Sequence, residues 1–339
     1  YAIGKHIDPK FETASMPFVQ IGEDATITRA TNDKKLVIVV AGETARADRF
    51  SLNGYQRETN LLLKNENITS FQSMYSCGTD TAFSLPCMFS QLGRSDYSHV
   101  QGKNMSNALD VLSHAGVQVL WRDNNSSSKS VADRVDYQDY RSSKTNTICD
   151  VECRDEGMLS NLQEYVDQHH KKDILIVLHT MGSHGPAYYK RYPKQFELFT
   201  PACQTNQLNE CSNEQINNAY DNTIVYTDYI LSKTIEFLKR NQTDYKTAMF
   251  YMSDHGESLG ENGLYLHGMP YFMAPEEQTH VGSILWLDEN FSKEVDVKLL
   301  AQQSKKRLSH DGLFHTLLGM MDVETQVYDN ELDYIPYVR

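Results

Sequence analysis

The sequence contains no hydrophobic run that could cross a lipid bilayer. Its longest aliphatic runs cover residues 36–41 and 174–178, whereas a transmembrane helix needs about 20 apolar residues. The amino terminus also lacks the charged and apolar pattern of a signal peptide. Because the chain begins at Tyr1 and not at a methionine, we expect a processed or truncated protein.

Positive charge is also scarce. The chain has 32 lysine and arginine residues against 45 aspartate and glutamate residues, which gives a net charge of −13. No basic stretch with interleaved aromatic residues occurs, so we do not expect a nucleic-acid partner. An acidic protein can still bind a phosphorylated substrate where metal ions reverse the local field.

The six cysteines include no CxxC pair, which argues against a cysteine zinc site. They lie instead as three pairs of near neighbours, and we expect three local disulfides: Cys77 with Cys87, Cys149 with Cys153, and Cys203 with Cys211. Disulfides form in an oxidising compartment. The alternative is six free thiols in a cytosolic enzyme.

The 339 residues suffice for one large α/β domain or two smaller ones. We expect a polar linker or arm over residues 1–33 and a folded domain over residues 34–339. Apolar runs predict buried strands at residues 36–41, 117–121, 173–178, 248–252 and 283–287. Helical patterns cover residues 104–115, 157–170, 213–240 and 310–318, whereas residues 130–155 read as a polar loop. This alternation predicts a mostly parallel sheet with helices on both faces.

Polar side chains follow several of these strands directly. Asp254 and His255 follow residues 248–252, and Glu43 follows residues 36–41 in the same way. Asn125, His179 and His184 follow two further strands, and ligands of an open parallel sheet bind at the carboxyl ends of its strands. The alternative for Asp254-His255-Gly256 is an ordinary turn that ends a strand.

Thr81 is the candidate nucleophile. It follows a hydroxyl-rich segment within the first cysteine pair and could open a helix, where backbone N–H groups and the helix dipole favour an anionic phosphate. The alternative is that Thr81 only caps that helix. We interpret His179, His310 and His315 as structural residues.

Oxygen and imidazole ligands without thiolates suit zinc, with manganese as a second possibility. A cation beside Thr81 would favour loss of its hydroxyl proton and would stabilise charge on a transferring phosphoryl group. His184 and His267 are candidate ligands of a second cation, and Lys129 could hold a phosphate oxygen.

Five motifs, in register and in order, resemble those of the phosphoethanolamine–lipid A transferases, a family that includes the mobile colistin-resistance enzymes. They lie at residues 42–48 (GETARAD), 77–81 (CGTDT), 86–90 (PCMFS), 181–186 (MGSHGP) and 253–261 (SDHGESLGE).

This resemblance implies an alkaline-phosphatase/sulfatase-like fold on the periplasmic face of the bacterial inner membrane. Residues 34–339 would be the catalytic domain of a protein whose amino-terminal membrane domain is absent from this chain. Thr81 would be the nucleophile, and one tightly bound Zn²⁺ would be held by Glu43, Thr81, Asp254 and His255. The residues expected to line the phosphoethanolamine pocket are Thr79, Asn125, Lys129, His184, Glu257 and His267.

The implied reaction has two steps. Thr81 takes phosphoethanolamine from phosphatidylethanolamine, which releases diacylglycerol, and then passes it to a phosphate of lipid A. This masks negative charge and weakens the binding of polymyxins such as colistin. Alternative acceptors are a core heptose or water, the latter making the protein a sulfatase-like hydrolase, although Thr81 lacks the C/S-x-P-x-R context of sulfatases. Two further alternatives are an enzyme that transfers phosphoglycerol and a secreted binding module with a structural metal.

Overall fold

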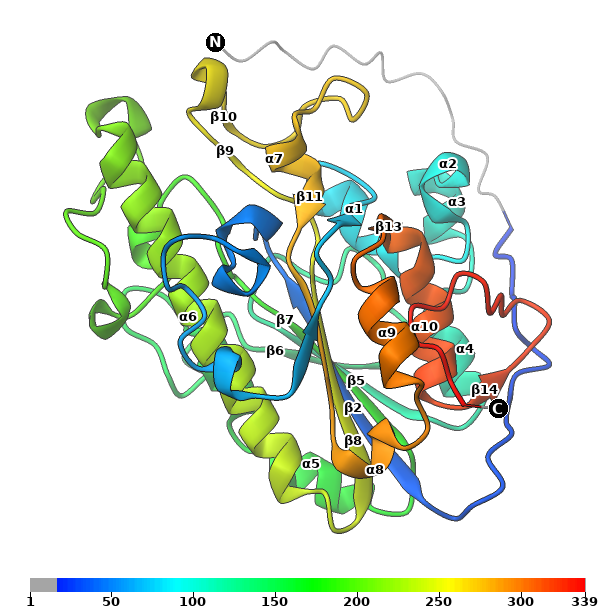
Figure 1. Ribbon diagram of the computed structural model, residues 1–339. Helices are drawn as coiled ribbons and strands as arrows, with labels where there is room; N and C mark the ends of the chain where they lie inside the picture. The colour runs from blue at the N-terminus through cyan, green and yellow to red at the C-terminus, as the bar shows by residue number, and fades with distance from the viewer. Residues whose placement is uncertain (1–16, 339) are drawn as a thin grey trace.

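The computed structural model describes residues 17–338, and its centre is a seven-stranded sheet (Figure 1). The strand order is β3-β12-β8-β2-β7-β5-β6. The bounds are β3 Ile68–Ser70, β12 Ser283–Leu287, β8 Tyr245–Ser253, β2 Lys34–Gly42, β7 Ile174–His179, β5 Gln118–Asp123 and β6 Asp136–Asp139. Strands β8, β2, β7, β5 and β6 run parallel, and β12 is antiparallel to β8. The prediction of a mostly parallel sheet is confirmed.

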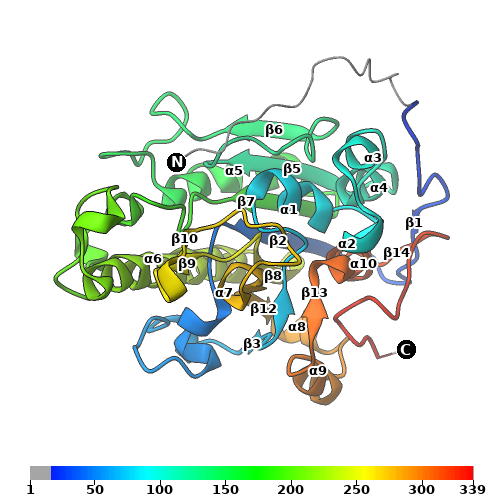
Figure 2. The same ribbon diagram turned by 90° about the horizontal axis from the view of Figure 1, so that it is seen from above.

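The central strand β2 is buried on both faces because its side chains alternate between two separate hydrophobic clusters. Val37, Val39 and Ala41 pack into one cluster, whereas Leu36 and Val40 pack into the other. The first is covered by α4 (Ala108–His114), α9 (Val297–Gln303) and α10 (Leu313–Met320), and the second by α5 (Leu162–Gln168) and α6 (Asn213–Arg240). Figure 2 shows the sheet between these two layers of helices.

Several predicted elements need correction. Residues 104–115 do not form one helix, because α3 (His99–Lys103) ends first and a capping box of Asn107 and Asp110 starts α4. Residues 157–170 contain a 3₁₀ turn, η4 (Asp155–Leu159), and then α5, because Asn161 adopts a left-handed conformation with φ 54°. The polar stretch at residues 130–155 contains β6, whose mostly exposed residues give no hydrophobic alternation.

Smaller elements surround the sheet. Short strands pair as β1 (Thr26–Ile27) with β14 (Val323–Glu324), β9 (Ser258–Leu259) with β10 (Tyr265–Leu266), and β4 (Met74–Tyr75) with both β11 (His280–Val281) and β13 (Leu308–Ser309). Short helices are α1 (Thr81–Met88), α2 (Gly93–Asp96), α7 (Glu276–Thr279) and α8 (Glu289–Ser292). The closing helix predicted at residues 310–318 is a 3₁₀ turn, η9 (His310–Gly312), followed by α10.

The predicted arm is described only from residue 17, since residues 1–16 lie outside the described part. Residues 17–33 contact the domain through β1 and the buried side chain of Ala25. The boundary at residue 33 stays a prediction. None of the helices within residues 17–338 combines the length and the apolar character that a membrane-spanning helix needs.

Three disulfides join the six cysteines as neighbouring pairs. The Cα atoms are 6.1 Å apart in Cys77–Cys87, 3.9 Å in Cys149–Cys153 and 5.8 Å in Cys203–Cys211. The first pair joins the segment before α1 to its last turn, and thereby fixes the start of that helix.

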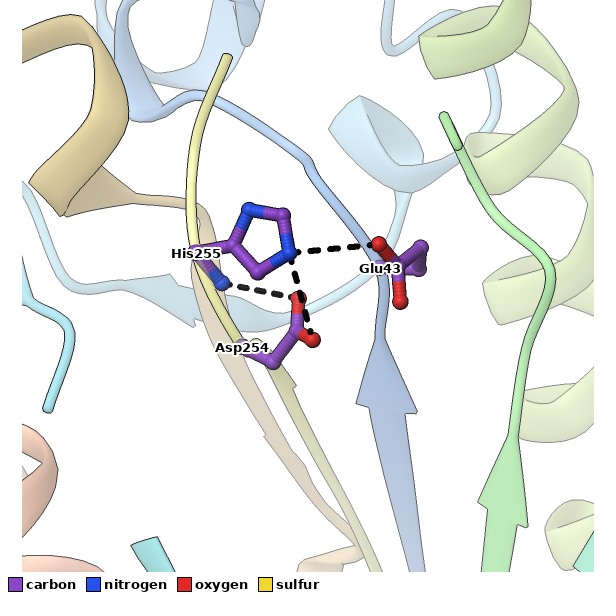
Figure 3. A group of neighbouring side chains, drawn as sticks. All are labelled: Glu43, Asp254 and His255. Carbon is purple, nitrogen blue, oxygen red and sulfur yellow. Dashed lines mark hydrogen bonds and ion pairs between the residues drawn. The ribbon is translucent and has the colours of Figure 1, made fainter. Parts of the chain in front are cut away.

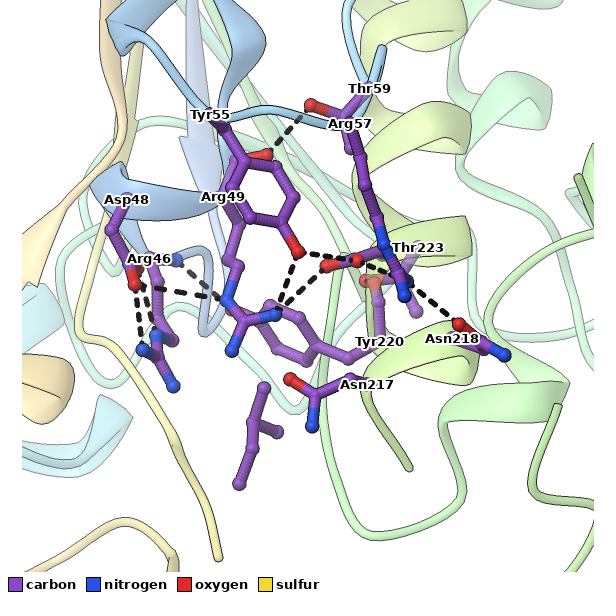
Figure 4. Close-up of polar contacts among 12 residues, drawn as sticks. Arg46, Asp48, Arg49, Tyr55, Arg57, Thr59, Asn217, Asn218, Tyr220 and Thr223 are labelled. Carbon is purple, nitrogen blue, oxygen red and sulfur yellow. Dashed lines mark hydrogen bonds and ion pairs between the residues drawn. The ribbon is translucent and has the colours of Figure 1, made fainter. Parts of the chain in front are cut away.

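A polar network fastens the segment after β2 to α6. Asp221, which is fully buried on α6, accepts hydrogen bonds from Arg49 (3.3 Å), Tyr55 (2.8 Å) and Arg57 (2.8 Å). Figure 4 shows these three side chains directed toward the helix, with Arg57 also reaching Asn218. The network fixes the chain just beyond Glu43.

Candidate active site

The carboxyl ends of β2 and β8 lie side by side below α1 and the β9–β10 hairpin (Figure 1). Gly42 is in register with Ser253, so Glu43 and Asp254 leave the sheet as neighbours. A side chain at position 42 would not fit, because a Cβ atom there would lie 2.6 Å from the ring of Tyr251. The glycine therefore leaves room for the Tyr251 ring at the strand end that carries Glu43.

Glu43, Asp254 and His255 form a compact buried group (Figure 3). All three side chains are 0% exposed, and Nε2 of His255 lies 3.3 Å from Oε1 of Glu43 and 3.6 Å from Oδ2 of Asp254. Within residues 17–338, this is the one group of three histidine, cysteine or carboxylate side chains whose ligand atoms all lie within 4.8 Å of one another.

The ligand atoms of this group that lack other partners are arranged to bind a metal cation. Nδ1 of His255 donates to the carbonyl oxygen of Gly256 over 2.9 Å, so Nε2 faces the carboxylates and would be the nitrogen that binds a cation. Oδ2 of Asp254 is buried and has no hydrogen-bond partner in the described part of the chain. An unpaired buried carboxylate oxygen is costly, and a bound cation would remove that cost. Two carboxylates and one imidazole match a zinc donor set.

The pKa values of the three side chains are consistent with a cation-binding group. Burial lowers the pKa of His255, but the charges of Asp254 and Glu43 outweigh it and raise that pKa to about 10. Burial and the charge of Glu43 raise the pKa of Asp254 to about 6. Burial also opposes ionisation of Glu43, yet the hydrogen bond and charge of His255 keep its pKa well below the ordinary value. A proton on His255 thus compensates the two carboxylates, which is the role that a cation would take over.

Thr81 points into the same group from the first turn of α1. Its Oγ1 donates to Oε2 of Glu43 over 3.0 Å and lies 3.2 Å from Nε2 of His255. Asp80, whose side chain accepts from the N–H of Phe83, is the N-cap of the helix. The alternative that Thr81 is merely the cap is therefore wrong, and its hydroxyl is available for chemistry.

Asn125 holds Glu43 in place. Its Nδ2 donates to Oε2 of Glu43 over 2.8 Å and to the carbonyl oxygen of Thr180 over 2.9 Å. Asp123 fixes the loop that carries Asn125, since its Oδ1 accepts from the backbone N–H groups of Asn125 and Ser127. The structure thus brings Asn125 to the predicted site, beside a carboxylate.

His184, Glu257 and His267 flank the group from a second side. Nδ1 of His267 lies 3.1 Å from Oε1 of the fully buried Glu257, and the ring of His267 is 4.4 Å from that of His255. The rings of His184 and His267 are 6.1 Å apart. Nδ1 of His184 and Oε2 of Glu257 are buried without a partner in the described residues. These atoms could bind a ligand, and the second cation stays a prediction.

The other two predicted pocket residues differ in their surroundings. Thr79 is buried, and its hydroxyl donates to the carbonyl oxygen of Met269 over 2.6 Å. It therefore links the loop before α1 to the loop after His267. Nζ of Lys129 donates to the carbonyl oxygen of Ser126 over 3.1 Å, and Lys129 lines a cavity beside α1.

Sequence reasoning missed the residues that orient the site. Thr44 contacts both carboxylates, with its hydroxyl donating to Glu43 and its backbone N–H to Asp254. The hydroxyl of Tyr220 on α6 donates to the carbonyl oxygen of Thr44 over 2.6 Å and accepts from the N–H of Arg46 over 3.0 Å. The only signal for Thr44 was its position next to Glu43, and Tyr220 gave none because it lies far away in the chain.

The histidines interpreted as structural have structural contacts. Nδ1 of His310 accepts from the N–H of Cys77 over 3.1 Å, and its Nε2 donates to the carbonyl oxygen of Ser253 over 3.0 Å. Nδ1 of His179 contacts Asp123 at 2.9 Å, and Nδ1 of His315 accepts from the N–H of Asp329 at 2.9 Å. These bonds hold the strand ends and α10 in place.

Comparison with known proteins identifies the family. The Sulfatase family profile matches residues 35–323. The chain belongs to the sulfatase family. The soluble domain of lipooligosaccharide phosphoethanolamine transferase A from Neisseria meningitidis superposes with a TM-score of 0.90 at 40% identity, over 94% of this chain and 98% of that domain. Within the sulfatase family the chain therefore groups with the phosphoethanolamine transferases, and the predicted fold and family are confirmed.

Two curated relatives extend this finding. Phosphoethanolamine transferase EptA of Escherichia coli strain K12 is 46% identical over 333 residues, which cover 96% of this chain and 61% of that protein. Phosphatidylethanolamine transferase Mcr-1 of Escherichia coli is 44% identical over 351 residues, which cover 100% of this chain and 63% of that protein. The chain thus spans less than two thirds of the length of either relative.

Proposed function

We propose that this chain is the catalytic domain of a zinc-dependent transferase that moves phosphoethanolamine from phosphatidylethanolamine to a phosphate of lipid A. The observation that carries the proposal is the position of the Thr81 hydroxyl, 3.0 Å from Glu43 and 3.2 Å from His255 at the start of a helix. The relatives EptA and Mcr-1 are named as a phosphoethanolamine transferase and a phosphatidylethanolamine transferase, which supports transfer of the phosphoethanolamine group.

The chemistry takes place in two displacements at one phosphorus atom. The hydroxyl of Thr81 gives up its proton and its oxygen forms a bond to the phosphorus of the donor. The bond from phosphorus to the diacylglycerol oxygen breaks, and that oxygen takes up a proton as diacylglycerol leaves. A phosphate oxygen of the acceptor then attacks the same phosphorus, and the electron pair of the Thr81–phosphorus bond returns to the threonine oxygen. Each step leaves the number of phosphorus bonds unchanged.

Residues of this chain supply the assistance that these steps need. Glu43, Thr81, Asp254 and His255 would hold a zinc ion, which favours the threonine alkoxide and stabilises charge on the phosphoryl oxygens. The first N–H groups of α1 face developing negative charge with the positive end of the helix dipole. His184 and Glu257 each have a buried atom without a partner in the described residues, and these atoms, with His267 beside them, would bind the phosphoethanolamine group or a second cation.

A membrane-embedded relative supports a proposal for the location of the whole protein. An integral membrane form of phosphoethanolamine transferase A from Neisseria meningitidis superposes over 94% of this chain and 61% of that protein, with a TM-score of 0.90. We therefore propose that the whole protein lies at the periplasmic face of the inner membrane, where its three disulfides would be stable. Transfer to lipid A there would reduce negative charge and confer resistance to polymyxins such as colistin.

Mass spectrometry of the chain after incubation with zinc and phosphatidylethanolamine tests the proposal. A phosphoethanolamine adduct should appear on the peptide that contains Thr81, and Thr81→Ala should abolish it. Thr243→Ala, at an exposed position remote from the site, is the matched control and should leave the adduct unchanged. An adduct on another residue, or adduct formation by Thr81→Ala, would refute the assigned nucleophile.

The mass spectrum of lipid A from cells that express the full-length protein identifies the acceptor. Added phosphoethanolamine on lipid A supports the proposed acceptor, whereas addition to a core heptose would replace it. Loss of the adduct to water at the same rate with and without acceptor would make the protein a hydrolase.

A further inference from the structure

A cavity of about 730 Å³ opens beside α1, the helix that begins with the candidate nucleophile. Its wall includes Ala82, the residue that follows Thr81, and Pro86 one turn further along α1. The opposite walls come from residues 97–103 and residues 127–137. The volume is within the usual range for a small-molecule site, about 300–1,000 Å³, and exceeds what a phosphoethanolamine group alone would fill.

The lining of this cavity is cationic in an acidic protein. Lys103, Lys129 and His99 line it together with a single carboxylate, Asp133, although the whole chain has a net charge of −13. Nζ of Lys129 bonds a carbonyl oxygen, and within residues 17–338 neither lysine forms an ion pair. Two lysine side chains without carboxylate partners, in a concave site, favour an anionic ligand.

The same cavity has aromatic walls. Tyr97 is buried there and packs against Phe83 with a ring distance of 5.1 Å, and the ring of Phe83 lies 5.2 Å from that of His99. Tyr137, on the edge strand β6, is 39% exposed and forms part of the opposite wall. Flat aromatic surfaces beside cationic groups suit a ligand with both an apolar ring face and a phosphate, such as a phosphorylated sugar.

Two short links connect the cavity to the reacting group. On one side, Thr81 and Ala82 are adjacent in the first turn of α1. On the other, the loop that lines the cavity with Ser127 and Lys129 begins at Asn125, which bonds Glu43. Ser127 and Lys129 have φ angles of 100° and 51°, and a strained loop of this kind persists where surrounding contacts hold it. Asp123 supplies such contacts at the backbone N–H groups of Asn125 and Ser127, and thereby fixes the loop that carries Lys129 into the lining of the cavity.

We propose that this cavity binds the phosphorylated sugar of the acceptor, with the sugar ring between Tyr97 and Tyr137 and a phosphate of the acceptor paired with Lys103. The inference rests on the proposed function, because it assigns a place to the second substrate of that reaction. Bound there, an acceptor phosphate oxygen approaches the phosphorus on Thr81, forms the new bond, and displaces the threonine oxygen.

The test separates the two displacements. The chain is first loaded with phosphoethanolamine on Thr81, and the decay of the adduct is then followed with glucosamine 1-phosphate, glucosamine or inorganic phosphate as acceptor. Lys103→Gln should slow decay to subsaturating glucosamine 1-phosphate by about tenfold or more, since a charged hydrogen bond is lost. Lys298→Gln, at an exposed position on α9, is the matched control and should decay like the wild type.

Equal decay in Lys103→Gln and the wild type would overturn the proposal. Inorganic phosphate accelerating decay as much as glucosamine 1-phosphate would also overturn it, because the cavity would then be a simple anion site. Tyr137→Ala provides a second variant at an exposed edge strand, where folding is least affected. It should weaken the response to the sugar phosphate by several fold and leave the response to inorganic phosphate unchanged.

If no adduct forms on Thr81, the proposed function fails, and the cavity is judged by equilibrium binding alone. Calorimetry of the zinc-loaded chain should then show that glucosamine 1-phosphate binds about tenfold more weakly to Lys103→Gln than to Lys298→Gln. Equal affinity of the two variants would overturn the assignment of the cavity.

Discussion

The backbone N–H of Thr44 donates a hydrogen bond of 3.1 Å to Oδ1 of Asp254. The hydroxyl of the same residue donates to Oε1 of Glu43, so Thr44 connects carboxylates that leave two neighbouring strands. Its φ angle of 59° lies in the left-handed region, which is unusual for a β-branched residue. Strain of this kind persists only where other contacts fix the backbone, and Tyr220 provides one at the carbonyl of Thr44.

Thr44→Val should therefore weaken metal binding without unfolding the protein. Valine keeps the β-branched shape and the backbone N–H but removes the donor to Glu43, and loss of such an outer hydrogen bond costs about 10- to 100-fold in metal affinity. Competition with a chromogenic zinc chelator measures the change, and circular dichroism reports the fold. Thr243→Val, at an exposed turn, is the control. If both variants bind zinc equally well, Thr44 does not orient Glu43.

Removal of the metal should destabilise the wild-type chain. Asp254 has a buried oxygen without a partner in the described residues, so the folded state gains from the cation and the unfolded state does not. A chelator should lower the Tm by about 5 °C or more for a tightly bound ion. The measurement is a thermal melt with and without chelator, repeated after zinc is restored.

Asp254→Asn is the informative variant for this measurement. Its Tm should be insensitive to the chelator, because the variant lacks one of the two carboxylates of the group. Asp96→Asn, which removes an exposed carboxylate at the end of α2, should retain the wild-type response. A chelator effect of the same size in Asp254→Asn would exclude this group as the metal site.

The hydrophobic pattern predicted the parts of the fold that are buried on both faces. Strands β2, β7 and β8 read as unbroken apolar runs because each packs helices on either side of the sheet. The edge strand β6 was missed for the opposite reason, since its mostly exposed residues are polar and its pairing with β5 depends on the rest of the sheet. The break at Asn161 was missed because a left-handed residue within a helical pattern has no reliable sequence signal.

The site residues that could be predicted are those of a metal-binding residue type that directly follow a predicted strand. Glu43, Asp254 and His255 are reactive residue types directly after strands, and parallel strands end at one edge. Thr44 acts partly through its backbone, and Tyr220 acts from a helix more than 170 positions away in the chain. Contacts of this kind depend on tertiary packing, so a single sequence does not reveal them. The cationic cavity likewise combines side chains from three separate segments.

Stability should depend on pH through Asp228 on α6. Burial raises the pKa of this carboxyl from 3.8 to about 6, although it accepts hydrogen bonds from the N–H groups of Leu62 and Leu63. The folded state holds the proton of Asp228 more tightly than the unfolded state does. The contribution of Asp228 to the free energy of unfolding therefore falls as the pH rises from about 4 to about 7. The free energy of unfolding should lose about 2 kcal/mol from this source between about pH 4 and 7.

Urea unfolding at several pH values isolates this contribution. Asp228→Asn has no ionisable group at that position, so the difference in free energy of unfolding between wild type and variant should change in favour of the variant as pH rises. Asp96→Asn, with its exposed side chain, should follow the wild type. A wild-type-to-Asp228→Asn difference that stays constant over the range would contradict the raised pKa.

The loss of stability should depend on which partner of the Asp221 network is removed. Asp221 is fully buried and accepts hydrogen bonds from Arg49, Tyr55 and Arg57. The side chain of Arg57, in contrast, is 34% exposed. Asp221→Ala leaves the mostly buried guanidinium of Arg49 without this carboxylate, and removing one partner of a buried pair costs about 3–5 kcal/mol. Arg57→Gln removes a partly exposed charge and should cost less than about 1 kcal/mol. Urea unfolding gives both values, and similar losses in the two variants would show that the burial of Asp221 does not decide the stability of this network.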